Sequence, residues 1–347
     1  MSVNNNYNNF VTKDTSYSPS GCGNSPKLRK ISEYLKYGIV HIDKPSNPSS
    51  HEVTTWVKEI LQCEKTGHAG TLDPSVTGVL TVCMNRATRL AKSQQSAGKE
   101  YICTIEFTGE VKKITKKEFD SACYKMTGHM LQRPPLLCAV KRELRLRWIY
   151  SIQTIEFKDN IGLFRVKCEA GSYIRTLCVH IGLILGQPAV MKDLRRIKSG
   201  EIEEEMCVTL QDLQDAFYMY KKHAEEKYLR KVVQPLESLL VSYKKIVIKD
   251  SAVNAVCYGA PLTAKGVYKY DPTIETSDTV VLITAKGEAV ALGNPLVNGM
   301  QLKDLEEGVV VKLQRVIMEK DLYPKNWGIG KEYEIYGEND ELLEVLQ

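Results

Sequence analysis

The segment Gly67-His-Ala-Gly-Thr-Leu-Asp-Pro74 decides how this chain is interpreted. Glycines allow unusual backbone angles and the close approach of another molecule. Pro74 holds the preceding Asp73 in extended geometry, which projects its carboxylate away from a helix. Catalytic groups concentrate on such loops, but aspartates also stabilise turns by bonding their own backbone. No second carboxylate lies in the segment, so a paired acid and base is not indicated, and both interpretations of Asp73 stay open.

The flanking sequence predicts strands and helices in mixed order. Ser49 and Glu52 have the spacing of a capping box and open an apolar helical stripe that ends near residues 65–67. The almost wholly apolar run 79–84 indicates a strand buried on both faces. Alternation and then helical spacing predict two half-buried strands and a helix, over 101–107, 164–168 and 174–185.

The sequence changes character after Tyr243. A charged helical stretch at about 210–230 comes before this point, and short strand-like runs separated by glycines follow it. Such spacing predicts a small β-barrel. Residues 1–35, rich in Asn, Ser, Pro and Gly, predict an extended arm rather than part of a core. The length of 347 residues agrees with about two domains.

The net charge of +5 is a mild excess, but basic residues cluster locally. One cluster lies within residues 141–147 and the other within 192–198. Both suit a phosphate backbone, and both are also what solvated helix faces look like. From charge alone the two interpretations stay open.

Several classes of protein are disfavoured by missing patterns. The ten cysteines form no C-x-x-C pair, and the six histidines lack zinc-ligand spacing, so we expect no metal site. Neither a P-loop nor a G-x-G-x-x-G motif occurs, so we expect no cofactor. The first residues lack the apolar core of a signal peptide, and no apolar run approaches membrane-spanning length. We therefore expect a soluble intracellular protein without membrane contact.

Five segments in order resemble the TruB family of pseudouridine synthases. The first is the Gly67–Pro74 segment itself, which resembles the signature of that family. The others resemble its lysine-x-tyrosine, Q-x-P-P, G-T-Y-I-R-T-L and L-R-R-x-x-S-G motifs; they are Gly98–Tyr101, Gln132–Arg142, Cys168–Cys178 and Leu194–Gly200. One such motif is weak evidence, but five in order are strong.

Further segments resemble the dyskerin branch of this family. They are Lys44–Glu52, Ser93–Tyr101, an N-terminal extension containing Tyr17–Pro26, and a PUA-like region containing Lys249–Ala255 and Val316–Gly330. The resemblance implies an α+β fold with a mixed, mainly antiparallel sheet flanked by helices, plus a small C-terminal PUA β-barrel. The expected domains are an arm (1–35), a catalytic domain (36–240), a PUA domain (243–320) and a tail (321–347).

The resemblance also implies a reaction and roles for residues. The uridine N1–C1′ bond breaks, the uracil rotates, and it rejoins through C5, without a cofactor. Asp73 is the expected catalytic carboxylate, which either attacks C1′ or removes the C2′ proton, and these alternatives stay open. Arg175 is expected to pair with Asp73; its alternative is an arginine on a solvated helix start. Tyr101 is expected to stack on the target base; its alternative is a core aromatic of a strand.

The remaining candidates bind rather than react. The resemblance places His68, Tyr173, Leu194 and Lys99 in the substrate pocket. The target nucleotide must be extruded from its stack to reach it. The candidate RNA contacts in the catalytic half are Lys141, Arg142, Arg195 and Arg196. Those in the PUA half are Lys249, Tyr258, Gly259, Lys265 and Gly266.

The dyskerin branch further implies partners and a compartment. We expect an H/ACA guide RNA, ribosomal and small nuclear RNA substrates, small core proteins that complete the particle, and a place in the nucleus and nucleolus. Two alternatives stay open. One is a stand-alone tRNA pseudouridine synthase, and the other is a scaffold that stabilises H/ACA RNA with catalysis dispensable.

Overall fold

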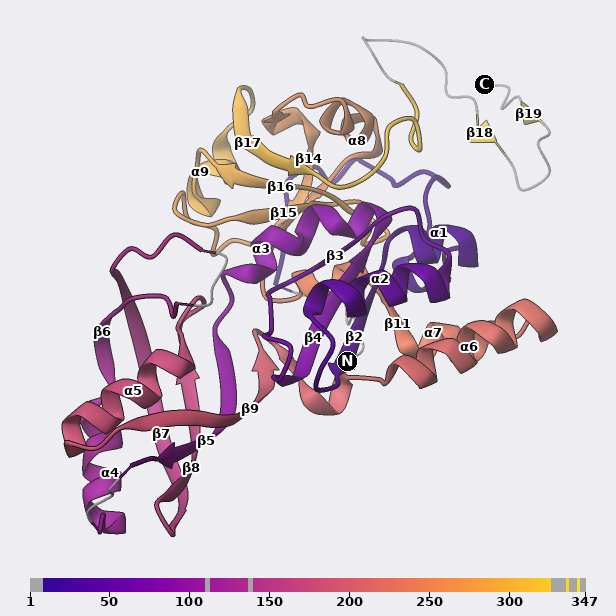
Figure 1. The fold of residues 1–347 in the computed structure, drawn as a ribbon. Coiled ribbons are helices and arrows are strands. Elements are labelled where there is room, and N and C mark those ends of the chain that lie inside the picture. The colour runs from indigo at the N-terminus through magenta and orange to yellow at the C-terminus, as the bar shows by residue number, and fades with distance from the viewer. Residues whose placement is uncertain (1–8, 110–112, 137–139, 326–334, 337–341, 344–347) are drawn as a thin grey trace. The chain divides into compact units, whose positions relative to one another are not determined.

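The computed structural model describes residues 9–109, 113–136, 140–325, 335–336 and 342–343 (Figure 1). The chain divides into two compact units. The central unit comprises residues 39–84 and 90–233. The terminal unit comprises residues 1–38, 85–89 and 234–347, so it takes in both ends of the chain.

A mixed sheet forms the frame of the central unit. Its strands lie in the order β2, β4, β9, β5, β8, β7, β6, with β3 paired to β4 and β10 paired to β9. Among these pairs β4 with β9 is parallel, and the others are antiparallel. The bounds are β2 Gly38–Lys44, β3 Thr66–His68, β4 Thr77–Met84, β5 Lys99–Phe107, β6 Gly128–Gln132, β7 Arg145–Lys158, β8 Ile161–Cys168, β9 Ala189–Ser199, β10 Ile202–Glu203 and β11 Val233–Pro235.

Helices flank this sheet. The α5 helix packs against β9 and α4, and α4 packs against β7. The bounds are α2 Ser50–Leu61, α3 Ala91–Gln95, α4 Lys116–Lys125, α5 Ile174–Leu185, α6 Leu210–His223 and α7 Glu226–Val232, with short 3₁₀ segments η2 Asn85–Leu90 and η3 Glu204–Met206.

The predicted elements of the central unit are largely confirmed. Ser49 and Glu52 form a capping box at the start of α2, and β4 is buried along most of its length. The predicted helix was too long, because Gln62 adopts the left-handed conformation (φ 53°) and ends it. The stretch 210–230 is likewise two helices rather than one, since Ala224 adopts φ 55° between α6 and α7.

A second sheet forms the terminal unit, in the order β1, β14, β12, β15, β16, β17, β13. Its apolar core includes Ile246, Val280, Val290 and Val311. The bounds of its elements are β1 Val11–Thr12, η1 Pro26–Leu28, α1 Ile31–Lys36, η4 Leu236–Leu240, β12 Lys244–Ile248, α8 Asp250–Cys257, β13 Leu262–Thr263, η5 Ala264–Gly266, β14 Val267–Tyr270, β15 Val280–Ile283, β16 Ala289–Pro295, α9 Gly299–Asp304, β17 Val309–Val316, β18 Ile335–Tyr336 and β19 Leu342–Leu343.

The N-terminal segment is built into the terminal unit. Its strand β1 pairs with β14 through Val11 and Tyr270. The buried Arg29 donates two hydrogen bonds to Glu237, at 2.6 and 3.1 Å. The sequence predicted an extended arm, and the structure shows that this segment also contributes a strand and a buried ion pair. Residues 1–8 and most of the predicted tail lie outside the described residues.

The predicted fold class is confirmed: a mixed, mainly antiparallel sheet flanked by helices, with a β-rich C-terminal domain. Within the described residues, each helix is too short or too polar to cross a bilayer. Six of the cysteines are buried, as expected for small apolar side chains; Cys138 lies outside the described residues.

Candidate active site

Asp73 lies on the loop between β3 and β4, and a hydroxyl from α2 fixes this loop. The buried Ser50 Oγ donates to the Leu72 carbonyl at 2.9 Å and accepts from the Leu72 amide at 2.7 Å. The Val76 amide donates to the Asp73 carbonyl at 3.0 Å and closes a turn. The Asp73 side chain is 43% exposed, so its carboxylate projects away from a rigid backbone.

A buried ammonium supports the far side of the loop. Lys44 Nζ donates to the carbonyls of Pro45, Pro74 and Val76 at 2.8, 2.9 and 2.8 Å. Burial lowers the pKa of this lysine, and the nearby Asp73 carboxylate opposes the shift. Lys44 lies at the end of β2, so its hydrogen bonds fix the position of the turn that carries Asp73 relative to the sheet.

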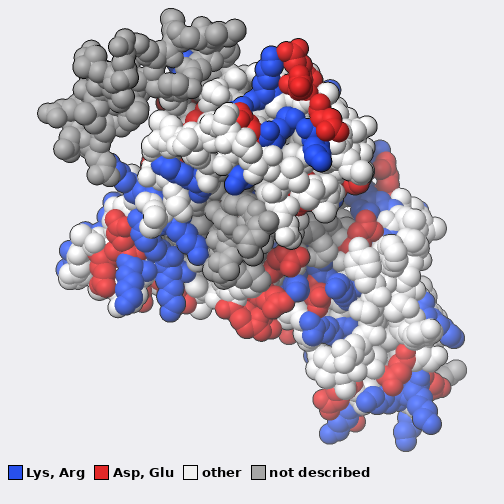
Figure 2. All heavy atoms as spheres, turned by 180° about the vertical axis from the view of Figure 1, so that it is seen from behind, with Lys and Arg blue, Asp and Glu red and all other residues white. Residues whose placement is uncertain are grey.

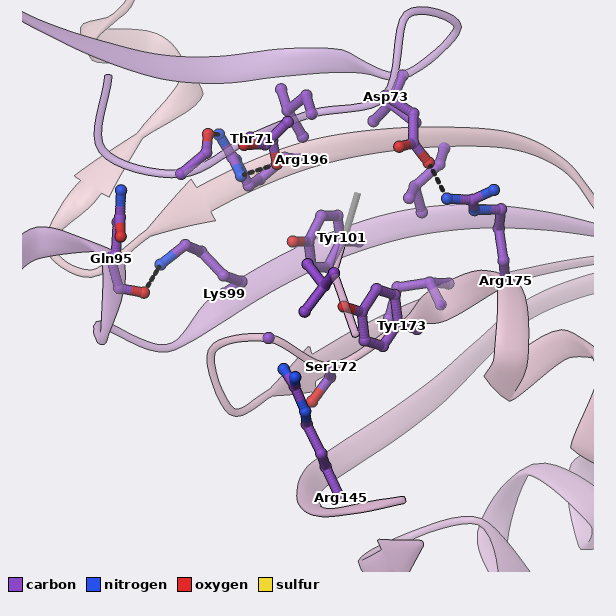
Figure 3. A pocket seen from close by; sticks show the side chains of 17 residues that line it. Thr71, Asp73, Gln95, Lys99, Tyr101, Arg145, Ser172, Tyr173, Arg175 and Arg196 are labelled. Atoms are coloured by element: carbon purple, nitrogen blue, oxygen red, sulfur yellow. Dashed lines mark hydrogen bonds and ion pairs between the residues drawn. The ribbon is translucent and has the colours of Figure 1, made fainter. Parts of the chain in front are cut away.

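A buried guanidinium supports the near side of the loop. Arg196, on β9, is 2% exposed. It donates to the carbonyls of Val79, Gly70 and Thr71 at 2.8, 3.1 and 3.5 Å, and Figure 3 shows it beside Thr71. The loop is therefore fixed by charged side chains from two strands and a hydroxyl from a helix.

Arg175 faces Asp73 from the start of α5. Its Nη2 lies 3.0 Å from Asp73 Oδ2, and Figure 3 shows the two side chains turned toward each other. A charge-assisted contact at this distance fixes the direction of the carboxylate. The predicted pairing of these residues is present in the structure.

These residues open onto a cavity of about 780 Å³ in the central unit. That volume lies in the range of ligand sites, which run to roughly 1,000 Å³. Figure 3 shows Tyr101 and Tyr173 close to the Asp73–Arg175 pair. The lining residues also include the predicted Lys99 and Leu194, the buried Arg196, Val140 from the segment before β7, and Arg145 at the start of β7.

Burial dominates the electrostatics of the pocket. It raises the pKa of the Tyr101 hydroxyl, while the Arg196 guanidinium opposes that shift. It lowers the pKa of Lys99 to about 8, and the positive charge of Arg196 acts in the same direction. The Lys99 ammonium donates to the carbonyl of Ala97. Tyr101 therefore stays protonated at neutral pH, while Lys99 changes charge in mildly alkaline solution.

His68 lies on β3, at the start of the loop, rather than among the residues that line the cavity. Its buried Nδ1 has no hydrogen-bond partner among the residues that the structure describes. Burial lowers the pKa of this imidazole, and the positive charge of Arg196 adds to the effect. His68 is therefore neutral at pH 7, and the contact predicted for it with a flipped nucleotide stays a prediction.

The four basic candidates of the central unit fall into two groups. Lys141 is 82% exposed and pairs with Glu143, and Arg142 donates to the Pro134 carbonyl at 3.1 Å. Arg195 donates to Asp43 and Glu204 at 2.7–3.1 Å, which raises its pKa. Arg195 and Arg196 are thus engaged by acceptors of the protein, whereas Lys141 extends into solvent. The RNA contacts predicted for all four stay predictions.

The PUA candidates all lie in the terminal unit. Lys249 pairs with Asp14 at 2.6 Å, and Lys265 pairs with Glu307 at 2.6 Å on an exposed surface. The Tyr258 hydroxyl donates to Asp321, at 3.1–3.2 Å from its two carboxylate oxygens. Gly259 has φ 100°, a conformation that favours glycine. A Cβ on Gly266 would lie 3.0 Å from Ala252 and Leu262, so Gly266 has a packing role as well.

Surface charge does not by itself mark an RNA-binding face. Figure 2 shows basic and acidic side chains lying next to one another over much of the face drawn. Many of the surface cations have carboxylate partners, as Lys198 does in Glu203 and Lys192 does in Glu106.

Sequence reasoning assigned no role to Lys44, Ser50 or Gln132, and it placed Arg145 only in the basic cluster that suits a phosphate backbone. Each stands in or beside a segment that carried the family resemblance, but its contact with the site is long-range. Only Lys44 had a usable signal in the sequence. A lysine at the end of an apolar strand needs several acceptors for its buried ammonium, and this indicates that it contacts nearby backbone carbonyls.

Comparison with known proteins defines the class of this chain. Family models match along its length: DKCLD (NUC011) domain (2–54), TruB family pseudouridylate synthase N-terminal domain (58–174), tRNA pseudouridylate synthase B C-terminal domain (175–241) and PUA domain (244–317). With the fold above, these matches make the chain an RNA pseudouridine synthase of the TruB family.

Its relatives narrow the class further. The chain is 51% identical over 328 residues to the H/ACA ribonucleoprotein complex subunit CBF5 of Saccharomyces cerevisiae, covering 94% of this chain and 68% of the relative. It is 49% identical over 328 residues to the subunit DKC1 of Homo sapiens, covering 94% and 63%. The chain therefore belongs to the CBF5/DKC1 family, the eukaryotic dyskerin branch that its sequence resembles.

Solved structures agree. One, described as an H/ACA RNP bound to a substrate RNA containing 2′-deoxyuridine, superposes with a TM-score of 0.83 at 39% identity, covering 92% of this chain and 97% of the other. Another, described as a Cbf5–Nop10–Gar1 complex, gives 0.82 at 41% identity, covering 91% and 96%.

Proposed function

We propose that this chain is the catalytic subunit of an H/ACA guide-RNA particle that isomerises uridine to pseudouridine in ribosomal and small nuclear RNA. The observation that carries the proposal is the pair of Asp73 with Arg175 at the mouth of a cavity in a TruB-type fold. The names of its relatives supply the particle, since both CBF5 and DKC1 are subunits of H/ACA ribonucleoprotein complexes. Processing of ribosomal RNA, in the nucleus and nucleolus, follows from that membership.

The residues divide the work as follows. The target uridine leaves its stack at a cost of a few kcal/mol, and stacking against an aromatic side chain recovers part of that cost. Tyr101 and Tyr173 line the cavity and offer such surfaces. Arg175 holds the Asp73 carboxylate toward the cavity, where it acts on the ribose, at C1′ or at the C2′ proton. Neither step needs a redox or group-transfer cofactor.

The division of labour along the chain is also part of the proposal. Residues 36–240 carry the reaction, and residues 243–320 bind the guide RNA through its backbone and shape, with small core proteins such as Nop10 and Gar1 completing the particle. The segment 1–35 forms an extension, and 321–347 a tail. Lys249, Tyr258, Gly259, Lys265 and Gly266 are the guide-RNA contacts we propose in the PUA half.

A reconstituted particle tests the reaction. Full chain, guide RNA and core proteins are assembled with a radiolabelled substrate, and pseudouridine is measured under single turnover. Asp73→Ala is expected to lower the rate by about 10³-fold or more, without changing assembly. Full activity of Asp73→Ala would contradict the assignment of the carboxylate, and robust turnover of tRNA without any guide would favour a stand-alone enzyme.

A cellular experiment tests the scaffold alternative. Cells depleted of this protein are supplied with the wild type or with Asp73→Ala, and guide-RNA levels, growth and ribosomal pseudouridine are measured. The proposal predicts that Asp73→Ala restores guide-RNA levels but not pseudouridine. Complete rescue of growth by Asp73→Ala would show that the scaffold role is the one that the cell requires.

A further inference from the structure

Gln132 forms a buried link between the end of β6 and the start of α5. Its side chain is 1% exposed. The amide Oε1 accepts from the Tyr173 amide at 2.9 Å, and Nε2 donates to the Tyr173 carbonyl at 3.4 Å. One side chain thus contacts both polar groups of a single backbone residue, which fixes the position and the rotation of that residue.

The helix start that Gln132 contacts has no side-chain cap of its own. Tyr173 is the N-cap residue of α5, with φ −101° and ψ 107°, and its side chain makes no capping bond. A helix start leaves amide groups without partners inside the helix. Gln132 supplies from another strand the acceptor for the N-cap amide that the N3 glutamate or glutamine of a capping box supplies locally.

Arg175 lies two residues after Tyr173, in the first turn of α5. A rigid first turn carries its side chains as one body, so a shift at Tyr173 also moves the Arg175 guanidinium. The partner Asp73 is fixed independently, by Lys44, Ser50 and Arg196. The 3.0 Å contact between Arg175 and Asp73 therefore depends on two separate sets of supports.

Among the other contacts of the same segment, two side-chain hydrogen bonds are more exposed. Arg147 Nε donates to the Gly171 carbonyl at 3.2 Å, and Thr176 Oγ1 donates to the Arg133 carbonyl at 3.2 Å. Contacts in water are readily replaced by solvent, whereas a buried amide that loses its partner is not. Gln132 is thus the most buried of these three supports at the start of α5.

We propose that Gln132 is a positioning residue of the pseudouridine synthase site: it acts through Tyr173 to hold Arg175 against Asp73. The inference rests on the proposed roles of Asp73 and Arg175, and it adds a residue that makes no contact with the substrate. A displacement of about 1 Å in such a site lowers a rate by about 10²-fold.

The experiment uses the reconstituted particle and compares three substitutions of Gln132. Gln132→Met keeps the size and removes both hydrogen bonds, and Gln132→Asn keeps the amide but shortens its reach. Both are expected to lower the single-turnover rate by about 10- to 100-fold, with the Kd for substrate RNA within about 3-fold of wild type. Gln132→Glu keeps the acceptor for the Tyr173 amide and is expected to recover part of the rate.

Thr176→Val is the matched control, since it removes a bond between the same two elements without touching Tyr173. Its rate is expected to stay within about 3-fold of wild type. Thermal unfolding is measured for every variant. If Gln132→Met does not fold, Gln132→Asn decides the question.

A double-mutant cycle with Arg175→Met identifies the route of the effect. If Gln132 acts through the helix start, Gln132→Met lowers the rate of Arg175→Met much less than it lowers that of wild type. Independent, multiplicative losses would overturn the proposal, as would a wild-type rate in Gln132→Asn or a loss confined to RNA affinity. A wild-type rate in Arg175→Met would instead refute the proposed site, which separates the two failures.

Discussion

Asp73 and Arg175 form an ion pair of 3.0 Å between two segments that are anchored separately. Their side chains are 43% and 31% exposed, so solvent screens the pair. Such a pair contributes little to the free energy of unfolding. The pair instead fixes the direction of the Asp73 carboxylate, because the Arg175 guanidinium holds it toward the cavity.

The first prediction separates charge from geometry at this pair. Arg175→Lys keeps the positive charge but lacks the planar fork that fixes a carboxylate. We expect the single-turnover rate to fall by about 10- to 100-fold, while the free energy of unfolding changes by less than about 1 kcal/mol. Arg165→Met is the control, because it removes a 2.6 Å pair with Glu100 that lies outside the cavity. A fully active Arg175→Lys would show that charge alone suffices.

The second prediction concerns the ammonium beneath the loop. Lys44→Met leaves the carbonyls of Pro45, Pro74 and Val76 without their donor in a buried setting. We expect a loss of about 2–4 kcal/mol in the free energy of unfolding and a fall in rate, because the turn that carries Asp73 loses its support. Urea denaturation and single-turnover kinetics measure the two effects.

Ser46→Ala is the control for this substitution. Ser46 bonds the neighbouring Ser75 carbonyl at 3.3 Å in an exposed position, so its loss is expected to cost less than about 0.5 kcal/mol. Equal stabilities of Lys44→Met and wild type would mean that water replaces the ammonium.

The third prediction is a pH dependence. Burial lowers the pKa of His41 to about 4, and its Nδ1 lies 2.9 Å from Thr81 Oγ1. The folded state therefore binds fewer protons than the unfolded state between about pH 4 and pH 6.5, so stability is lost as the pH falls through this window. At pH 4.5 the loss from this one group is about 2–3 kcal/mol.

His41→Asn tests this prediction, because asparagine offers a polar group near the position of Nδ1 but does not titrate. The stability advantage of wild type over His41→Asn, measured by urea denaturation, should shrink by about 2–3 kcal/mol between pH 7 and pH 4.5. Other titrating groups are common to both proteins and cancel. An unchanged difference would mean that the imidazole is protonated in the folded state.

The fourth prediction concerns the N-terminal segment. Arg29→Met leaves Glu237 buried without its 2.6 Å partner, which is expected to destabilise the protein by about 3–5 kcal/mol. Burial also raises the pKa of Glu288, 4.0 Å from Arg29 Nε, so this second carboxylate suffers from the same loss. The exposed pair of Lys36 with Glu319 serves as the control, and Lys36→Met should cost less than about 1 kcal/mol. Comparable losses in both variants would contradict this reasoning.

Local pattern was enough to predict much of this fold. The capping box at Ser49, the alternation in β5 and β8 and the glycine after α5 each depend on neighbours in the sequence, and each has its expected structure. Two helices end earlier than predicted, at Gln62 and Ala224. Both residues adopt the left-handed conformation, but neither is a glycine, so no signal in the sequence marks these helix ends. Propensity is a weak guide at such positions because tertiary contacts decide the conformation.

In the site, too, local motifs could be recognised from the sequence, whereas long-range contacts could not. Asp73 and Arg175 could be named from motifs, and so could the tyrosines of the cavity. Gln132 could not be given a role, because its two hydrogen bonds reach a residue that only the sheet brings near. Arg195 is a related case: a basic cluster suggested phosphate contacts, and the structure shows Asp43 and Glu204 around it.

The strand β1 pairs with β14, and Arg29 with Glu237, so this segment finds its partners only after the long stretch of chain between them has been made. Synthesis at roughly 5–20 residues per second leaves that segment waiting for many seconds. During this interval β1 lacks its partner strand and Arg29 lacks Glu237, so both must stay in water or bind a chaperone. Assembly of the terminal unit is thus a late event in the biosynthesis of this protein, because a segment made early must wait for partners that are made late.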